Sequence, residues 1–169
     1  RAMLRASSFD GGQLTHMLET VNDLLTRDLE GRFVTCFVGI LNPATHTITY
    51  VAAGHGPMIF YRYADDNFDS IIATGIPLGV MEGADYSETI THVFEPGDFL
   101  AITTDGFFEA MCPEGDLYGV ERMIDFMRER RELPADQMLS RLHDEISKFI
   151  GDQEAQDDRT GILLRRTRV

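Results

Sequence analysis

Apolar residues near the start of the chain recur at helical spacing. Over residues 11–30 they are separated by three or four positions, so that they share one face of a helix. These residues are Leu14, Leu18, Val21, Leu25 and Leu29. We expect Gly31 to end this helix, because glycine readily adopts the backbone conformation that follows a helix C-terminus.

From residue 33 onward the pattern changes to short segments rich in β-branched and aromatic residues, which predict strands. Turn-forming residues at 42–45 are expected to join the first two strands into a hairpin. Residues 74–83 contain three glycines and one proline and are predicted to form a loop. The predicted strands are 33–41, 47–51, 58–61, 70–72, 88–94, 99–103 and 160–164.

Helical patterns return after Gly106. They predict a short helix over 107–111 and longer helices over 120–130 and from Pro134 onward. Antiparallel hairpins thus come first and helices cluster later. This order favours an α+β fold, a layered α/β/β/α sandwich of antiparallel sheets and helices, over a doubly wound parallel sheet. A length of 169 residues predicts a single domain over residues 1–169.

The composition limits the classes of partner and compartment. The chain has 28 acidic and 15 basic residues, a formal net charge of −13, which repels nucleic acid and anionic membranes unless positive charge is clustered. Two arginine clusters, at 128–131 and 165–168, are interpreted as solvated ends of a helix and a strand. No apolar run approaches the ~18 residues of a membrane helix. Cys36 and Cys112 lie far apart, which favours reduced thiols in a cytoplasmic protein.

Asp105 is the first candidate for chemistry. It follows the predicted strand 99–103 and precedes Gly106. A carboxylate at the end of a buried strand is held rigidly and supplies the oxygen ligands that Mg²⁺ and Mn²⁺ prefer. The alternative is structural: the aspartate caps the helix that is predicted to begin at residue 107.

Asp157 and Asp158 are a second candidate, directly before the last predicted strand. Neighbouring side chains of a strand face opposite sides, so only one of the two acids can point at a given site. Alternatively, the pair is the acidic end of a surface loop. His55, between two glycines, is a possible base or ligand, or else a structural turn residue.

Five motifs follow one another in a specific order. They are 33–35, Ala53-Gly54-His55-Gly56-Pro57, Pro77-Leu78-Gly79-Val80, the segment 96–110 with Thr104-Asp105-Gly106, and Asp157-Asp158-Arg159-Thr160. This order resembles the SpoIIE/RsbU-type serine phosphatases, a bacterial branch of the metal-dependent, type 2C-like protein phosphatases. The similarity runs along nearly the whole chain.

The resemblance implies two stacked antiparallel sheets flanked by helices, with a two-metal site for Mn²⁺ or Mg²⁺ at one end of the sheets. A metal-activated water would hydrolyse a phosphomonoester there. Asp105 matches one metal-ligand aspartate of the family and Asp157 aligns best with another, with Asp158 as its neighbour. The resemblance therefore assigns catalytic roles to Asp105 and Asp157 and metal binding to all three acids. Gly106 would let the backbone pass close to the metal.

The chain departs from the family in one respect. Members begin with a strand carrying Gly-Asp-x-Tyr-Asp and a helix opening with Asp-x-x-Gly-x-Gly, and neither motif occurs here. The resemblance thus implies the C-terminal part of a phosphatase domain without its N-terminal strands, cut from a longer protein. No long apolar region follows residues 1–5, so no signal peptide is expected. Such a part should bind Mg²⁺ poorly, and open edges at 33–41 and 160–164, or the leucine stripe of 11–29, could support a homodimer.

Two functions follow. In the first, the parent protein is an enzyme that dephosphorylates a protein of the anti-anti-sigma type, under control of an N-terminal sensor or receiver domain, while residues 1–169 alone are inactive. In the second, the chain is a degenerate phosphatase-like module that binds a regulator without catalysis. Retention of Asp105 and of the acidic pair Asp157-Asp158 favours the enzyme.

Overall fold

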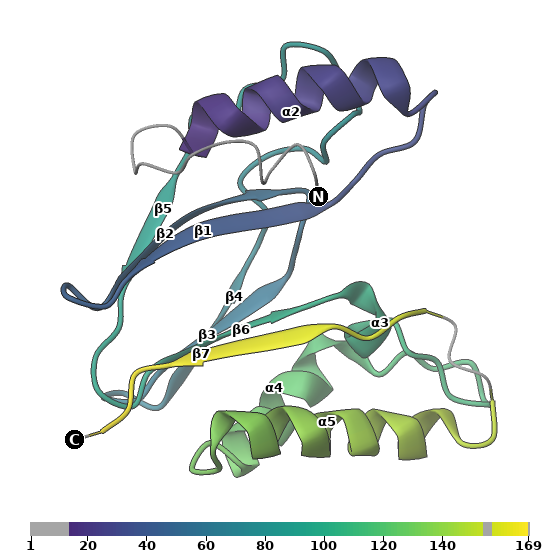
Figure 1. Cartoon of the computed structure of the whole chain (residues 1–169). Helices are drawn as coiled ribbons and strands as arrows, with labels where there is room; N and C mark the ends of the chain where they lie inside the picture. Colours follow the sequence, from purple (N-terminus) through teal and green to yellow (C-terminus); the bar gives the residue numbers. More distant parts are fainter. Residues whose placement is uncertain (1–13, 154–156, 169) are drawn as a thin grey trace. The chain divides into compact units, whose positions relative to one another are not determined.

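A computed structural model describes residues 14–153 and 157–168. It divides the chain into two compact units (Figure 1). Unit 1 comprises Arg1–His55 with Ile72–Phe94, and unit 2 comprises Gly56–Ile71 with Glu95–Val169. All helices and strands below belong to one unit or the other.

In its described residues, unit 1 contains one helix beside a three-stranded antiparallel sheet, in the order β1-β2-β5. Its elements are α2 (Leu14–Asp28), β1 (Cys36–Asn42), β2 (Thr47–Ala53) and β5 (Ile90–Val93). The apolar face of α2 packs on this sheet (Figure 1), with Leu18 fully buried among Val51, Leu78 and Tyr86. The predicted leucine stripe is therefore largely buried within its own unit. The expectation that this stripe could support a homodimer is wrong.

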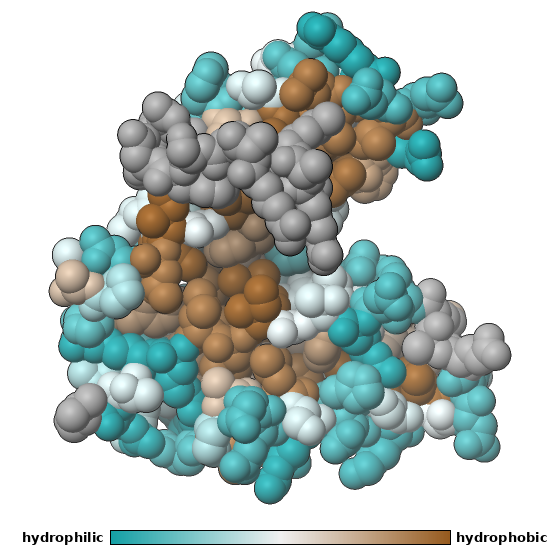
Figure 2. All heavy atoms as spheres, viewed as in Figure 1, coloured by the Kyte–Doolittle hydropathy of each residue, from teal (hydrophilic) through white to brown (hydrophobic). Residues whose placement is uncertain are grey.

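Unit 2 contains a four-stranded antiparallel sheet, in the order β4-β3-β6-β7. Two long helices, α4 and α5, cover one face of it (Figure 1). The surface over α5 in Figure 2 is mostly hydrophilic, as expected for the outer side of an amphipathic helix. The elements are β3 (Met58–Arg62), β4 (Asn67–Ile71), β6 (Phe99–Thr103), α3 (Asp105–Phe108), α4 (Gly119–Glu129), α5 (Ala135–Ile150) and β7 (Gly161–Arg165).

The α+β class with antiparallel sheets is confirmed, and the differences from prediction are local. The first strand begins at Cys36 rather than at residue 33, because Val34 pairs with Leu78 in an isolated bridge instead of joining β2. The helix predicted to begin at residue 107 begins at Asp105. Within the described part, β1 and β5 are the end strands of one sheet and β4 and β7 those of the other. None of the helices in this part is long and apolar enough to span a membrane.

Candidate metal centre

The pairing of β6 with β7 brings the candidate acids to one end of the unit 2 sheet. Its last register pair is Thr103 with Gly161. Asp105 follows Thr103 by two residues, and the acidic pair 157–158 precedes Gly161 by three or four. In an antiparallel pair, one strand ends where its partner begins, so the segment after β6 and the segment before β7 lie at the same end of the sheet.

Asp105 is the first residue of α3 and not its cap. The N-cap position belongs to Thr104, whose backbone is extended (φ −74°, ψ 161°). The carboxylate of Asp105 is exposed, and its Oδ1 accepts a hydrogen bond from the backbone N–H of Gly106 at 3.0 Å. The N–H of Phe107 donates to the carbonyl of Thr104 instead. The capping role considered for Asp105 is therefore wrong.

The acidic pair lies in a bend before β7, and both side chains are exposed. Asp157 Oδ1 accepts a hydrogen bond from the N–H of Asp158 at 2.7 Å. The next residue, Arg159, reaches α5, where its guanidinium donates to Ser147 Oγ at 3.2 Å and to the carbonyl of His143 at 3.4 Å. The pair is thus connected to α5 as well as to the sheet.

The carboxylates of these acids are suitable ligands for a hard divalent cation, but the described residues do not form a complete metal site. Exposed carboxylates are the oxygen donors that Mg²⁺ and Mn²⁺ prefer. Across residues 14–153 and 157–168, however, no group of three or more His, Cys, Asp or Glu side chains is placed to hold a metal ion. Within the described residues, the three acids alone therefore do not form a complete metal site.

His55 lies in unit 1, and its ring makes an edge contact with Phe37, with ring centroids 6.5 Å apart. It follows β2 in the chain, in the segment between two glycines that was singled out above. The contact fits the structural interpretation of this residue.

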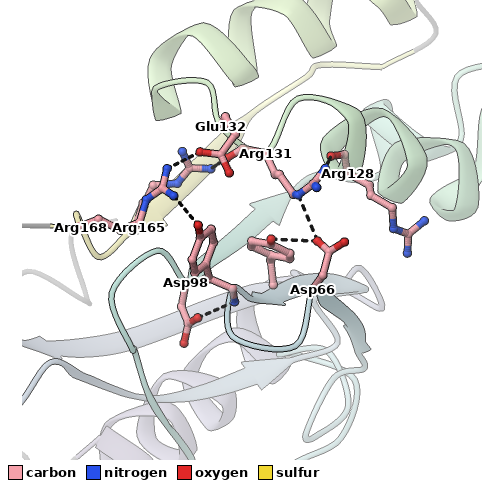
Figure 3. A network of polar contacts seen from close by, with 9 residues as sticks. Asp66, Asp98, Arg128, Arg131, Glu132, Arg165 and Arg168 are labelled. Carbon is pink, nitrogen blue, oxygen red and sulfur yellow. Dashed lines mark hydrogen bonds and ion pairs between the residues drawn. The ribbon is translucent and has the colours of Figure 1, made fainter.

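Arg131, Arg165 and Arg168 of the two arginine clusters belong to a polar network at the opposite end of the same sheet (Figure 3), whereas Arg128 and Arg130 pair with the exposed Asp125 and Glu129 of α4. Arg131 pairs with Asp66 at 3.1 Å, and Arg168 pairs with Glu132. Arg165 donates to backbone carbonyls of the turn between α4 and α5. These contacts of Arg131, Arg165 and Arg168 therefore link the segment between α4 and α5 to the sheet.

Sequence reasoning identified the acids but missed Thr104 and Arg159. A threonine directly before a helix is ordinarily interpreted as an N-cap. Its contact across the sheet depends on the register of β6 with β7, which hydrophobic patterning does not reveal. In the sequence, the position of Thr104 next to Asp105 was the only indication of a role in the site.

Comparison with known proteins identifies the family. Residues 1–167 match the family of Stage II sporulation protein E (SpoIIE). The chain belongs to the SpoIIE family. A curated relative of this SpoIIE-family chain is the phosphoserine phosphatase RsbU of Bacillus subtilis, 29% identical over 155 residues that cover 90% of this chain and 45% of RsbU. The chain thus spans less than half the length of this relative.

Solved structures show the same fold. One contains the PP2C phosphatase domain and a fragment of the regulatory domain of SpoIIE from Bacillus subtilis, with a TM-score of 0.72 and 20% identity, covering 97% of this SpoIIE-family chain and 46% of the other. Another is RsbX in complex with magnesium, with a TM-score of 0.64 and 15% identity, covering 96% and 68%. The chain therefore has the fold of PP2C phosphatase domains, and a structural neighbour binds a divalent metal.

Proposed function

We propose that this chain is the C-terminal part of a metal-dependent phosphatase domain. The complete protein would remove phosphate from phosphoserine or phosphothreonine on a protein partner. The observation that carries the proposal is the register of β6 with β7, which brings Asp105 to the same sheet end as Asp157 and Asp158 in a SpoIIE-family chain. The likeness to a phosphoserine phosphatase supports the choice of substrate.

The three acids would act as oxygen ligands, with Asp105 and Asp157 as direct ligands and Asp158 beside them. A bound Mn²⁺ or Mg²⁺ pair would supply an activated water and neutralise charge on the phosphoryl group. We place the remaining ligands in a segment that precedes Arg1 in the parent protein, because the chain lacks the two N-terminal family motifs and covers 45% of RsbU. Residues 1–169 alone should therefore bind metal weakly and turn over little substrate.

The proposed partner is a small phosphorylated protein of the anti-anti-sigma type in the cytoplasm, with an N-terminal sensor or receiver domain as regulator. At a net charge of −13 the chain itself does not attract a phosphorylated surface, so the metal must provide the positive site.

The end strands β1 and β7 favour association of residues 1–169 into a homodimer, because unpaired strand edges recruit other strands. Light scattering at low and moderate salt measures this; a monomer at both would contradict it.

The test is hydrolysis of a chromogenic phosphomonoester, and of a phosphorylated anti-anti-sigma protein, by the full-length protein and by residues 1–169. We expect the full-length protein to be active with Mn²⁺ or Mg²⁺ and inactive with EDTA, and residues 1–169 to be nearly inactive in both cases. Binding of the phosphoprotein without hydrolysis by the full-length protein would instead support the degenerate binding module. Full metal-dependent turnover by residues 1–169 would show that the missing motifs are dispensable.

A further inference from the structure

Thr104 occupies a cap position but its hydroxyl does not cap. A threonine at an N-cap usually accepts a hydrogen bond from the second or third N–H of its helix. At Thr104 no such side-chain bond forms, although its backbone is extended as a cap requires. The hydroxyl is therefore used for something other than the start of α3.

The hydroxyl instead crosses to the segment that follows Asp157. It donates to the carbonyl oxygen of Asp158 at 3.0 Å and accepts from the N–H of Thr160 at 3.0 Å. The backbone N–H of Thr104 also donates to the carbonyl of Thr160 at 3.0 Å. The residue directly before Asp105 is thus bonded to both residues that flank Arg159.

We propose that Thr104 is a positioning residue that sets the spacing between Asp105 and the pair Asp157-Asp158. Regular pairing of β6 with β7 reaches only to Gly161, the first residue of β7, so the acidic pair lies outside the paired strands. Exposed carboxylates of like charge repel one another, and the Thr104 hydroxyl opposes their separation through the backbone. The contacts of Arg159 with α5, at 3.2 and 3.4 Å, do not join Asp105 to the pair.

The consequence for metal binding rests on the proposed function. Groups that orient metal ligands typically contribute a factor of roughly 10 to 100 in metal affinity. We therefore expect Thr104→Val in the full-length protein to raise the Kd for Mn²⁺ by roughly 10- to 100-fold, measured by electron paramagnetic resonance of free Mn²⁺. Thr104→Ser keeps the hydroxyl and should restore the affinity. Thr104→Ala provides a second removal of the hydroxyl, without a branched side chain that could fail to pack.

A second measurement reads the contact without metal. Because the Thr160 N–H bonds to the Thr104 hydroxyl, amide hydrogen exchange at Thr160 should accelerate in Thr104→Val and Thr104→Ala and return to the wild-type rate in Thr104→Ser. Thr49→Val is the matched control, since Thr49 also bonds through its hydroxyl, to Thr91 Oγ1 at 2.8 Å, but in the sheet of unit 1. This control should change neither the exchange at Thr160 nor the Kd.

Wild-type exchange at Thr160 in both hydroxyl-free variants would overturn the proposal, as would a serine variant as defective as the valine variant. Faster exchange with an unchanged Kd for Mn²⁺ would also overturn it, because the contact would then be structural only. If the wild-type protein binds no Mn²⁺ at all, the proposed function fails instead, and the exchange rates still decide whether Thr104 holds the acidic pair.

Discussion

Gly106 lies against the backbone of Asp158, so closely that a Cβ on residue 106 would come within 2.6 Å of the Asp158 carbonyl oxygen. Such a Cβ would also lie 3.1 Å from the Asp158 carbonyl carbon. Backbone atoms cannot move aside as the end of a flexible side chain can. Glycine at this position thus allows the start of α3 and the acidic pair to approach each other.

We expect Gly106→Ala to destabilise unit 2 by about 1–3 kcal/mol, the usual cost of forcing extra volume into a packed site. A loss of stability would be informative, because replacing glycine by alanine within a helix ordinarily stabilises the helix by about 1 kcal/mol. Urea unfolding of the variant and the wild type measures the difference. A variant as stable as the wild type would mean that the two segments can separate without cost.

Asp105→Asn tests the assigned ligand directly. Asparagine keeps the shape of the side chain but removes the charge that a divalent cation requires. In the full-length protein we expect the Mn²⁺-dependent hydrolysis rate to fall by at least about 100-fold, since a metal contributes several kcal/mol to stabilising the transition state. Asp116→Asn is the control: Asp116 is exposed in the loop before α4 and should leave the rate unchanged. Equal losses in both variants would contradict a specific role for Asp105.

Hydrophobic patterning located the elements of this fold well, because strands and helices bury their apolar residues at different spacings. The strand at 99–103 is the clearest example: all five residues are buried, and its bounds coincide with the prediction. The start of β1 was less predictable. Phe33 and Val34 have the composition of a strand, but Val34 bonds to Leu78, far along the chain, and such pairing leaves no local signal.

The candidate site was predictable only in part, for a related reason. Local patterns allowed a structural role for both Asp105 and the acidic pair, as a helix cap and as part of a surface loop. Only the ordered motifs of a known family favoured a metal site over these alternatives. Their closeness depends on which strands pair and in what register, and neither is encoded in a single segment. The role of Thr104 was hidden for the same reason, because its partners lie more than fifty residues away.

Asn22 should be the most sensitive polar residue of unit 1. Its side chain is fully buried in α2 and holds the loop that carries the Pro77–Val80 motif: Nδ2 donates to the carbonyl of Met81 at 2.8 Å, and Oδ1 accepts from the N–H of Gly79 at 2.9 Å. Asn22→Ala would leave the buried N–H of Gly79 and the partly buried carbonyl of Met81 without this partner, and an unsatisfied buried group costs about 1–3 kcal/mol. We expect a loss of about 3 kcal/mol in the free energy of unfolding, measured in urea.

The control for this variant is Asn42→Ala. Asn42 Oδ1 also accepts backbone hydrogen bonds, from Ala44 and Thr45, but in an exposed turn where water can replace the side chain. Its loss should therefore cost less than about 1 kcal/mol. Similar losses for the two variants would show that burial does not determine the importance of Asn22.

Tyr61 should make the stability of unit 2 sensitive to alkaline pH. The side chain is 1% exposed, and its hydroxyl donates to Asp66 Oδ1 at 2.9 Å. Burial, together with this hydrogen bond to a carboxylate, raises the pKa of Tyr61 from 10 to about 12. An unfolded tyrosine loses its proton near pH 10, whereas the folded one keeps it until about pH 12, so the folded state binds more protons between these values.

The stability that Tyr61 contributes is therefore fully present below pH 10 and is lost as the pH rises from 10 through about 12. The expected slope is a loss of about 1.4 kcal/mol per pH unit, the value for one proton. Tyr61→Phe cannot ionise and should remove this share of the decline, although it also removes the bond to Asp66 and so lowers stability at neutral pH. Urea unfolding at a series of pH values between 9 and 12 compares the two slopes, and parallel slopes would mean that Tyr61 ionises equally easily in the folded and unfolded chain.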